Sequence, residues 1–311
     1  MTPTDLLDLL FVDHVRDDGG DLRDFLRRWG PPAPSEPSAF ARLAHVAVHA
    51  GDRLSASVAG HQAAIRRLFP GTPDDAVTAF CVSEDQGPRP SGILSTLTPA
   101  AGGFVLNGAK KWGSLSPLAD LLYIAASIGE AEGRKQLRMV KVAAGSAGLT
   151  LDTSPYAAYR DHMPIADLKL VDVAVAADEV LAQDAYTDFI KPFRLVEDVY
   201  GAVAVQIGVL HVGRVHGWPQ ETLEDLTALI LQGHAISETP MSRPVDVVLM
   251  SAFFRAWDAV WSGLSPCWDR IPPEERTRWS PSTGTLGVAA RARETRRQNA
   301  WAELTSASTQ H

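Results

Sequence analysis

Cysteine is scarce in this sequence, since Cys81 and Cys267 are the only two among 311 residues. Two cysteines cannot form the disulfide framework of a small secreted domain, so the reducing cytoplasm is the natural compartment. Basic residues are also outnumbered, with 29 Lys and Arg against 37 Asp and Glu and a formal net charge of −8. A protein that binds nucleic acid through the phosphate backbone needs a dense basic surface, and this balance argues against one.

Long apolar runs are missing as well. No uninterrupted run reaches the roughly 18 residues of a membrane-spanning helix. The first residues, Met1–Leu7, have neither a basic region nor a signal-peptide cleavage pattern. We therefore expect a soluble cytoplasmic protein without membrane or nucleic-acid partners. Its 45% hydrophobic and 21% charged residues are typical of a globular chain that can bury a sizeable core.

Several catalytic motifs are absent too. No Gly-x-Ser-x-Gly elbow, phosphate-binding P-loop or Gly-x-Gly-x-x-Gly follows a predicted strand, which leaves hydrolase, NTPase and Rossmann readings unsupported. His45 and His49 are four residues apart on a predicted helix, a spacing compatible with a metal. No glutamate lies between them and no third ligand is obvious, so we favour a structural role and expect no metal site.

The spacing of apolar residues changes twice along the chain. Residues 1–75 show helical spacing, with a proline-rich linker at 30–37, and helical spacing returns in 184–311. Between them, residues 76–183 contain short apolar or alternating runs flanked by turn formers, which predict strands. The predicted helices are two short ones within 1–29, a stretch over 38–69 broken near Gly51 or Gly60, and 189–215, 223–236, 245–261 and 286–304. The predicted strands are 76–82, 103–107, 121–126 and 168–175.

Two motifs stand in the predicted β segment. The first is Phe80-Cys-Val-Ser-Glu-Asp85 at the end of a strand, and the second is Leu106-Asn-Gly-Ala-Lys-Lys-Trp-Gly-Ser-Leu115 some twenty residues later. They resemble the aromatic-Ala-Leu-Thr-Glu-Pro and Leu-Asn-Gly-x-Lys-x-Trp-Ile-Thr-Asn motifs of the acyl-CoA dehydrogenase family. Ala119-Asp120 and the Leu170–Val175 strand agree with that family as well. The clear resemblance covers roughly residues 65 to 181.

The resemblance implies a multidomain α+β fold. We expect an N-terminal helical domain over 1–75, shorter than the family's, a middle β-barrel domain over 76–183 and a C-terminal helical bundle over 184–311. It also implies an FAD-dependent oxidoreductase that introduces an α,β double bond into an acyl thioester, such as a CoA thioester, or a related acyl compound. Family members assemble into oligomers, so a homo-oligomer, or a hetero-oligomer with a related chain, is expected.

The resemblance also assigns a flavin site. Ser114 stands where the family has a flavin-binding hydroxyl, and Trp112 would cover one face of the isoalloxazine ring, as an aromatic side chain does well. Val82 and Ser83 match the segment that contacts the pyrimidine edge. Arg214 is a candidate for the pyrophosphate, because arginine suits phosphate oxygens.

The sequence departs from the family's pattern at the positions that bind the substrate and at the position of the catalytic base. Residues 86–92 replace a loop that contacts acyl-CoA, and Arg89 within them could meet an anionic group. His162 falls where the family has a small residue lining the flavin region. The usual C-terminal Gly-Gly-x-Gly motif before a catalytic glutamate is missing. Glu197, on the first helix of the C-terminal domain, is the candidate base, with a solvated surface charge as the alternative.

Two other functions fit these departures. A flavin-dependent monooxygenase on the same fold needs no glutamate base. A non-catalytic subunit that completes the site of a related partner chain would suit a shortened sequence without a clear base. Uptake of FAD would support the dehydrogenase or the monooxygenase, and a failure to bind FAD would support the non-catalytic subunit.

Overall fold

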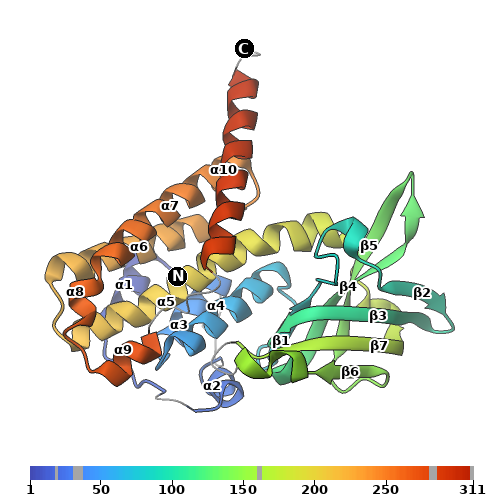
Figure 1. The fold of residues 1–311 in the computed structure, drawn as a ribbon, viewed down its shortest axis with the longest axis horizontal. Helices are drawn as coiled ribbons and strands as arrows, with labels where there is room; N and C mark the ends of the chain where they lie inside the picture. Colours follow the sequence, from blue (N-terminus) through green and yellow to red (C-terminus); the bar gives the residue numbers. More distant parts are fainter. Residues whose placement is uncertain (18–19, 31–37, 160–162, 280–285, 309–311) are drawn as a thin grey trace. The chain divides into compact units, whose positions relative to one another are not determined.

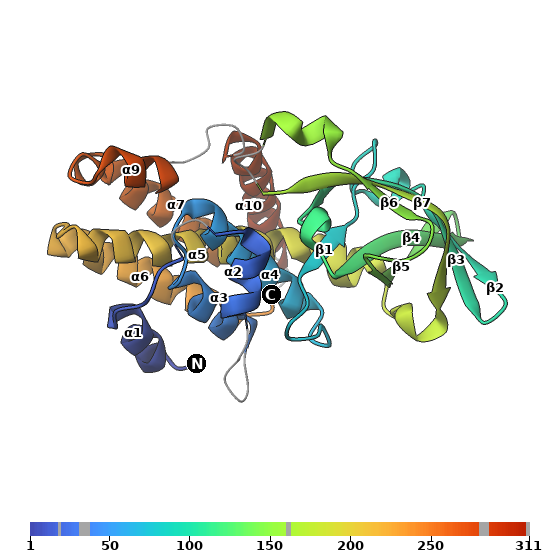
Figure 2. The ribbon, with the colours of Figure 1, turned by 90° about the horizontal axis from the view of Figure 1, so that it is seen from below.

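The computed structural model describes residues 1–17, 20–30, 38–159, 163–279 and 286–308. The chain divides into two compact units, which Figures 1 and 2 show as a bundle of helices and a sheet. The helical unit comprises Met1–Phe25, Pro32–Ala64 and Leu195–His311. The sheet unit comprises Leu26–Pro31 and Ile65–Arg194.

In the residues that the structure describes, the sheet unit contains seven strands, which Figure 1 labels. They are β1 Thr78–Cys81, β2 Thr96–Ala100, β3 Gly103–Ser114, β4 Leu121–Ala131, β5 Arg134–Ala143, β6 Leu149–Asp152 and β7 Ile165–Ala176. Their spatial order is β1-β4-β2-β3-β7-β6, and β5 pairs with β4 along its other edge. Strands β1 and β2 run parallel to β4, while the remaining pairs are antiparallel. The sheet curls around an apolar core that includes Leu97, Leu106, Leu122, Ile124 and Val140.

Strand β7 shows how the sequence pattern maps onto this core. Ala166, Leu168 and Leu170 are buried at every second position, and the buried set then shifts by one residue to Val173 and Val175. The shift coincides with a β-bulge in the pairing to β3, between Leu106 and Gly108 on that strand. A bulge inserts one extra residue and so resets which face the following side chains occupy.

Ten α-helices are assigned in the described residues. They are α1 Pro3–Phe11, α2 Leu22–Trp29, α3 Ala39–Ala47, α4 Arg53–Leu68, α5 Lys191–Val215, α6 Gln220–Ser237, α7 Pro244–Gly263, α8 Ser265–Trp268, α9 Pro273–Trp279 and α10 Leu286–Ser308. Helices α4 and α5 approach closely at Gly60, where an added Cβ would lie 2.8 Å from the Gly201 Cα. The absence of a side chain at Gly60 therefore allows the two helix backbones to approach, whereas a Cβ added at Gly201 would meet nothing within 4 Å.

The α+β fold class predicted from the sequence is confirmed. Each predicted helix and strand is present, and the stretch over 38–69 is interrupted between α3 and α4, near Gly51. Strands β2, β5 and β6 were not predicted. In β5, Arg134, Lys135 and Gln136 precede the first buried residue, so its apolar alternation starts late. In β2, Pro99 lacks the amide that an interior strand position needs, which obscures the strand pattern.

Helix α5 contains a long apolar stretch. The segment Ala185–Val215 is long and apolar enough to cross a membrane, although 67% of its most apolar window is buried inside the protein. The core helix of a soluble protein has this character. Val199, Tyr200, Val203 and Ala204 are among its fully buried residues.

The segment that follows α1 is clasped by side chains of the helical unit. The Arg214 guanidinium donates to the carbonyls of Leu10 and Phe11, both at 2.9 Å, and thereby satisfies the free end of α1. The His49 Nδ1 donates to the Val15 carbonyl at 2.7 Å, and its ring centroid lies 5.3 Å from that of His14. The segment is thus held by hydrogen bonds from Arg214 and His49, and His14 packs against the His49 ring.

Burial depresses the pKa values of several histidines in this region. The pKa of His211 falls to about 4, chiefly through burial and then through the positive charges of Arg16 and Arg214. Burial also lowers the pKa values of His45 and His49. The unfolded chain therefore binds more protons than the folded one between the ordinary histidine pKa of roughly 6.5 and pH 4.

We expect the free energy of unfolding to fall as the pH drops through this window. For His211 alone, the loss between pH 7 and pH 5 should be about 2 kcal/mol, because the unfolded state gains the proton first. Urea unfolding at both pH values measures it. The His211→Asn variant should lose that share of the pH dependence, and an unchanged slope in the variant would refute the assignment.

Candidate functional site

A buried ion pair lies beneath the two motifs of the sheet unit. Lys110 on β3 is fully buried, and its Nζ donates to the Glu84 Oε1 at 2.6 Å and to the Val82 carbonyl at 3.3 Å. Burial lowers the pKa of the Lys110 ammonium, and the Glu84 charge partly offsets that effect. A buried charge of this kind is tolerated only when it is paired and hydrogen-bonded.

The Glu84 carboxylate accepts hydrogen bonds from donors on two segments, β3 and the residues before β2. Besides Lys110, it accepts hydrogen bonds from the Leu94 amide at 2.8 Å, the Ser95 amide at 3.1 Å and the Ser95 hydroxyl at 2.9 Å. Burial raises the pKa of this carboxyl, but the Lys110 charge and these donors outweigh burial and hold it below the usual value. Glu84 therefore stays ionised and ties the end of β1 to β3 and to the start of β2.

Gly108 of the second motif allows this arrangement sterically. Its backbone has φ +142°, and an added Cβ would lie 2.3 Å from the Ser95 Oγ. Because Ser95 uses that hydroxyl to bind Glu84, it cannot retreat without giving up the bond. A glycine is required here by close approach as well as by conformation.

The predicted flavin-site residues Val82, Ser83, Trp112 and Ser114 converge at one corner of the sheet unit. The Lys111 amide donates to the Ser83 carbonyl at 2.8 Å, which places Val82 and Ser83 beside the end of β3. Trp112 follows with a left-handed φ of 55° and 51% of its surface exposed. Ser114 is half-buried at the end of the same strand, opposite Ile165 of β7.

Arg89 lies at the edge of a groove in the same unit. It is exposed and precedes the short 3₁₀ turn Pro90–Gly92, whose first two residues line the groove. The groove has a volume of about 590 Å³, within the range of small-molecule sites. Its walls come from the β4–β5 hairpin and the π-helical turn Ala185–Ile190 and include Glu130, Arg134, Lys135, Gln136, Asp184 and Tyr186.

The other predicted site residues belong to the helical unit or lie outside the described residues. Glu197 is in the helical unit, where its Oε1 accepts a hydrogen bond from the nearly fully buried His61 at 2.8 Å. Arg214 is also in that unit, where its contacts to Leu10 and Phe11 give it a structural role. His162 lies outside the described residues.

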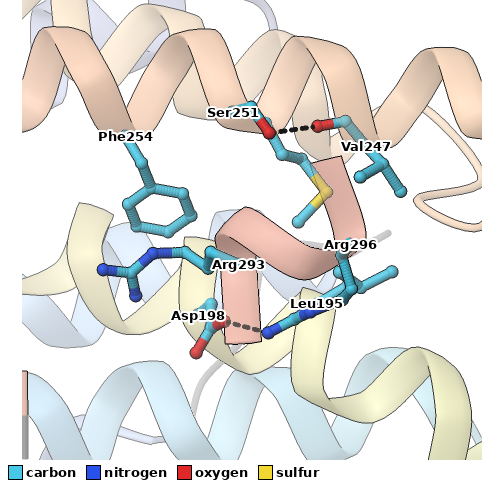
Figure 3. Close-up of a pocket in the computed structure, with 8 residues that line it drawn as sticks. Leu195, Asp198, Val247, Ser251, Phe254, Arg293 and Arg296 are labelled. Atoms are coloured by element: carbon cyan, nitrogen blue, oxygen red, sulfur yellow. Dashed lines mark hydrogen bonds and ion pairs between the residues drawn. The ribbon is translucent and has the colours of Figure 1, made fainter. Parts of the chain in front are cut away.

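A second cavity, in the helical unit, is too small for a substrate (Figure 3). Its volume is about 20 Å³, which is room for roughly one water molecule. Arg296 pairs there with Asp198 at 3.4 Å, and the Arg293 guanidinium lies 4.4 Å from the Phe254 ring centroid. Within the ranges that the structure describes, no group of three His, Cys, Asp or Glu side chains could hold a metal ion.

Comparisons with known proteins bear on the fold. No protein-family model matches the sequence. The protein named probable acyl-CoA dehydrogenase FadE10 of Mycobacterium tuberculosis is 35% identical over 91 residues, which are 28% of this chain and 14% of that protein. The benzylmalonyl-CoA dehydrogenase of Aromatoleum aromaticum is 32% identical over 94 residues, 30% of this chain and 24% of that protein. These matches span about a quarter or less of either relative.

Solved structures match nearly the whole chain. FkbI, from the biosynthesis of the methoxymalonyl extender unit of Fk520, superposes with a TM-score of 0.60 at 18% identity, covering 96% of this chain and 99% of that one. Butyryl-CoA dehydrogenase from Megasphaera elsdenii gives 0.58 at 14% identity, covering 96% and 92%. The chain has the acyl-CoA dehydrogenase fold.

The motif resemblance to acyl-CoA dehydrogenases is thereby confirmed at the level of the fold. A further structure of this fold is TdsC from Paenibacillus, in a complex with FMN and indole, with a TM-score of 0.58 at 14% identity over 84% of this chain and 82% of that one. Acyl-CoA dehydrogenase-like structures thus include flavin complexes. The motif residues here are the ones that the Lys110–Glu84 pair holds together.

Sequence reasoning missed this ion pair. Lys110 and Glu84 belong to the quoted motifs, yet charged residues are ordinarily solvated, and the pairing joins positions 26 residues apart. The available signal was the placement of Lys110 in a strand where alternation points it to the same face as Leu106 and Gly108.

We expect Gly108→Ala to destabilise the protein more than Gly129→Ala. Both glycines have a positive φ, +142° and +123°, but nothing lies within 4 Å of a Cβ added at Gly129. The difference in the free energy of unfolding, roughly 2 kcal/mol, isolates the clash with Ser95. Equal losses in urea unfolding of the two variants would show that Ser95 gives way without cost.

Proposed function

We propose that this chain is a flavoprotein oxidoreductase that binds FAD at the corner formed by Val82, Ser83, Trp112 and Ser114. The observation that supports it is that the two motif segments that carry these residues lie side by side, joined by the Lys111–Ser83 hydrogen bond and by the Lys110–Glu84 pair. A bound flavin would supply a hydride acceptor. The reaction proposed is the α,β-dehydrogenation of an acyl thioester or a related acyl compound.

The exposed groups at the corner fit a flavin. Half of the Trp112 surface is accessible, and an indole ring offers the flat apolar face on which an isoalloxazine ring stacks. The Ser114 hydroxyl, two residues further along β3, can donate a hydrogen bond to a ring oxygen or nitrogen. Beneath them, the buried ion pair fixes the backbone that carries both side chains, so the site would be organised before the cofactor arrives.

The groove next to Arg89 fits the substrate part of the proposal. Its volume of about 590 Å³ can accept an extended chain, and Arg134 and Lys135 lie in its lining. Lys135 donates to the Ile93 carbonyl at 2.7 Å, so its side chain is anchored across the groove wall. Arg89 and Arg134 are both exposed, and guanidinium groups bind phosphate oxygens strongly, which suits a CoA thioester.

Glu197 is the proposed base, with His61 as its positioning residue. The His61 ring is 4% exposed and holds the carboxylate of Glu197, which is 26% exposed, at 2.8 Å. A hydrogen bond from a fixed imidazole orients the carboxylate, as a positioned general base requires. This pairing removes Glu197 from the class of freely solvated helix glutamates.

Flavin uptake tests the proposal directly. Protein purified under native conditions should show a flavin absorption spectrum, and acid should release FAD. Trp112→Ala should raise the FAD dissociation constant about tenfold through lost stacking. Trp301→Ala, which removes a tryptophan of similar exposure on α10, should leave it unchanged. A colourless wild-type protein that also fails to bind added FAD would refute the proposal and favour a non-catalytic subunit.

Glu197→Gln tests the base separately from the cofactor. The variant should keep its flavin spectrum and lose activity toward acyl thioesters by about a hundredfold or more, because general-base catalysis typically contributes that much. Glu294→Gln is a matched control, since Glu294 pairs with Arg297 on the surface of α10. Full activity in Glu197→Gln would exclude Glu197 as the base.

A flavin-dependent monooxygenase is the second candidate. The observation that favours it is the fold shared with TdsC in its complex with FMN and indole. Turnover that requires oxygen and a supply of reduced flavin would support the monooxygenase. Turnover of an acyl thioester with an artificial electron acceptor, in the absence of oxygen, would support the dehydrogenase.

A further inference from the structure

The β-bulge at Trp112 is a strained feature of the flavin corner that the motifs do not explain. On β3, Lys110 pairs with Leu168 and Gly113 with Ala166, so Lys111 and Trp112 together oppose the single residue Asp167. Trp112 adopts φ 55°, a left-handed conformation that costs a non-glycine residue roughly 1–2 kcal/mol. Such a conformation persists only where the surroundings hold it.

The bulge takes two backbone amides out of the sheet ladder, and each finds an acceptor elsewhere. The Lys111 amide donates to the Ser83 carbonyl at 2.8 Å, on the segment after β1. The Trp112 amide donates to the Tyr156 hydroxyl oxygen at 3.3 Å and to the Asp167 Oδ1 at 3.4 Å. Adjacent residues of the bulge are therefore held by different parts of the chain, Lys111 by Ser83 and Trp112 by Tyr156 and Asp167.

Asp167 accepts the hydrogen bonds that hold Trp112 and its neighbours in place. Its Oδ1 accepts the Tyr156 hydroxyl at 2.6 Å, and its Oδ2 accepts the Lys111 Nζ at 2.9 Å. Burial raises the pKa of this carboxyl, but the bonds from Tyr156 and Lys111 outweigh burial and hold the pKa below the usual value. An ionised carboxylate can serve the Trp112 amide, Tyr156 and Lys111 at once, which a neutral amide side chain cannot, since it offers one acceptor oxygen.

We propose that Asp167, acting with Tyr156, is a positioning residue that locks the Trp112 backbone so that the indole and Ser114 face the flavin. This inference rests on the proposed FAD site and assigns to it a residue outside both motifs. Asp167 acts through the backbone amide of Trp112 and through Lys111. Ser114 follows two residues later on the same strand, so its place depends on the same bulge.

FAD titration of single and double variants tests the proposal. Asp167→Ala should weaken FAD binding about tenfold, Asp167→Asn less, and Tyr156→Phe about threefold, because charged hydrogen bonds contribute more than neutral ones. Asp85→Asn is the matched control, since Asp85 is 87% exposed and approaches Lys111 only at 3.8 Å. It removes one negative charge nearby and should change the dissociation constant less than twofold.

A double-mutant cycle distinguishes positioning from general destabilisation. If Asp167 acts through Trp112, then Asp167→Ala should weaken FAD binding less in a Trp112→Ala background than in the wild type, because only its effect through Ser114 remains. Additive losses would overturn the proposal. Amide hydrogen exchange over residues 110–114 should also accelerate in Asp167→Ala and not in Asp85→Asn, a readout that needs no flavin.

The outcomes separate this inference from the proposed function. A wild-type protein that binds no FAD refutes the proposed function, and with it the presentation of Trp112 to a flavin. A wild-type protein that binds FAD, with affinity and amide exchange unchanged in Asp167→Ala, overturns the role of Asp167 alone.

Discussion

The ion pair between Lys110 and Glu84 is the interaction on which the arrangement of the sheet unit depends. One carboxylate joins the end of β1, the start of β2 and the middle of β3, and each partner contributes a hydrogen bond that water cannot replace in the buried interior. Removal of either charge would leave the other buried and unpaired, which is among the costliest single changes in a protein. The Lys110–Glu84 pair therefore determines that the end of β1, the start of β2 and the middle of β3 pack together.

Two residues of β3 affect this arrangement in opposite ways, since one relieves a steric conflict and the other introduces one. Gly108 relieves a steric conflict, because the absence of a side chain lets Ser95 come close enough to serve Glu84. Trp112 introduces a conflict, because a large side chain occupies a left-handed backbone position. The first lies in the buried layer and the second at the exposed edge. This division is common where a rigid scaffold presents a strained residue to a ligand.

Much of the fold could be predicted from the sequence, and the failures have physical causes. Apolar spacing marks helices such as α6 and α7, because a helix that packs on one face repeats its pattern. Strand β5 escaped prediction because its exposed half is basic, and β2 because Pro99 interrupts it. For the site, the motif placed Val82, Ser83, Trp112 and Ser114 in one region. It could not show Asp167 or His61, whose partners lie 55 and 136 residues away.

The hydrogen bonds from Arg214 to the end of α1 can form only late in the synthesis of the chain. The bond from its guanidinium to the Leu10 carbonyl joins positions 204 residues apart. At typical synthesis rates, α1 would leave the ribosome roughly 10 s or more before its docking side chain exists. During that interval the carbonyls of Leu10 and Phe11 would lack the guanidinium that they bind in the finished protein. The end of α1 is thus completed late in synthesis, and a chaperone that binds α1 as it emerges would act in this interval.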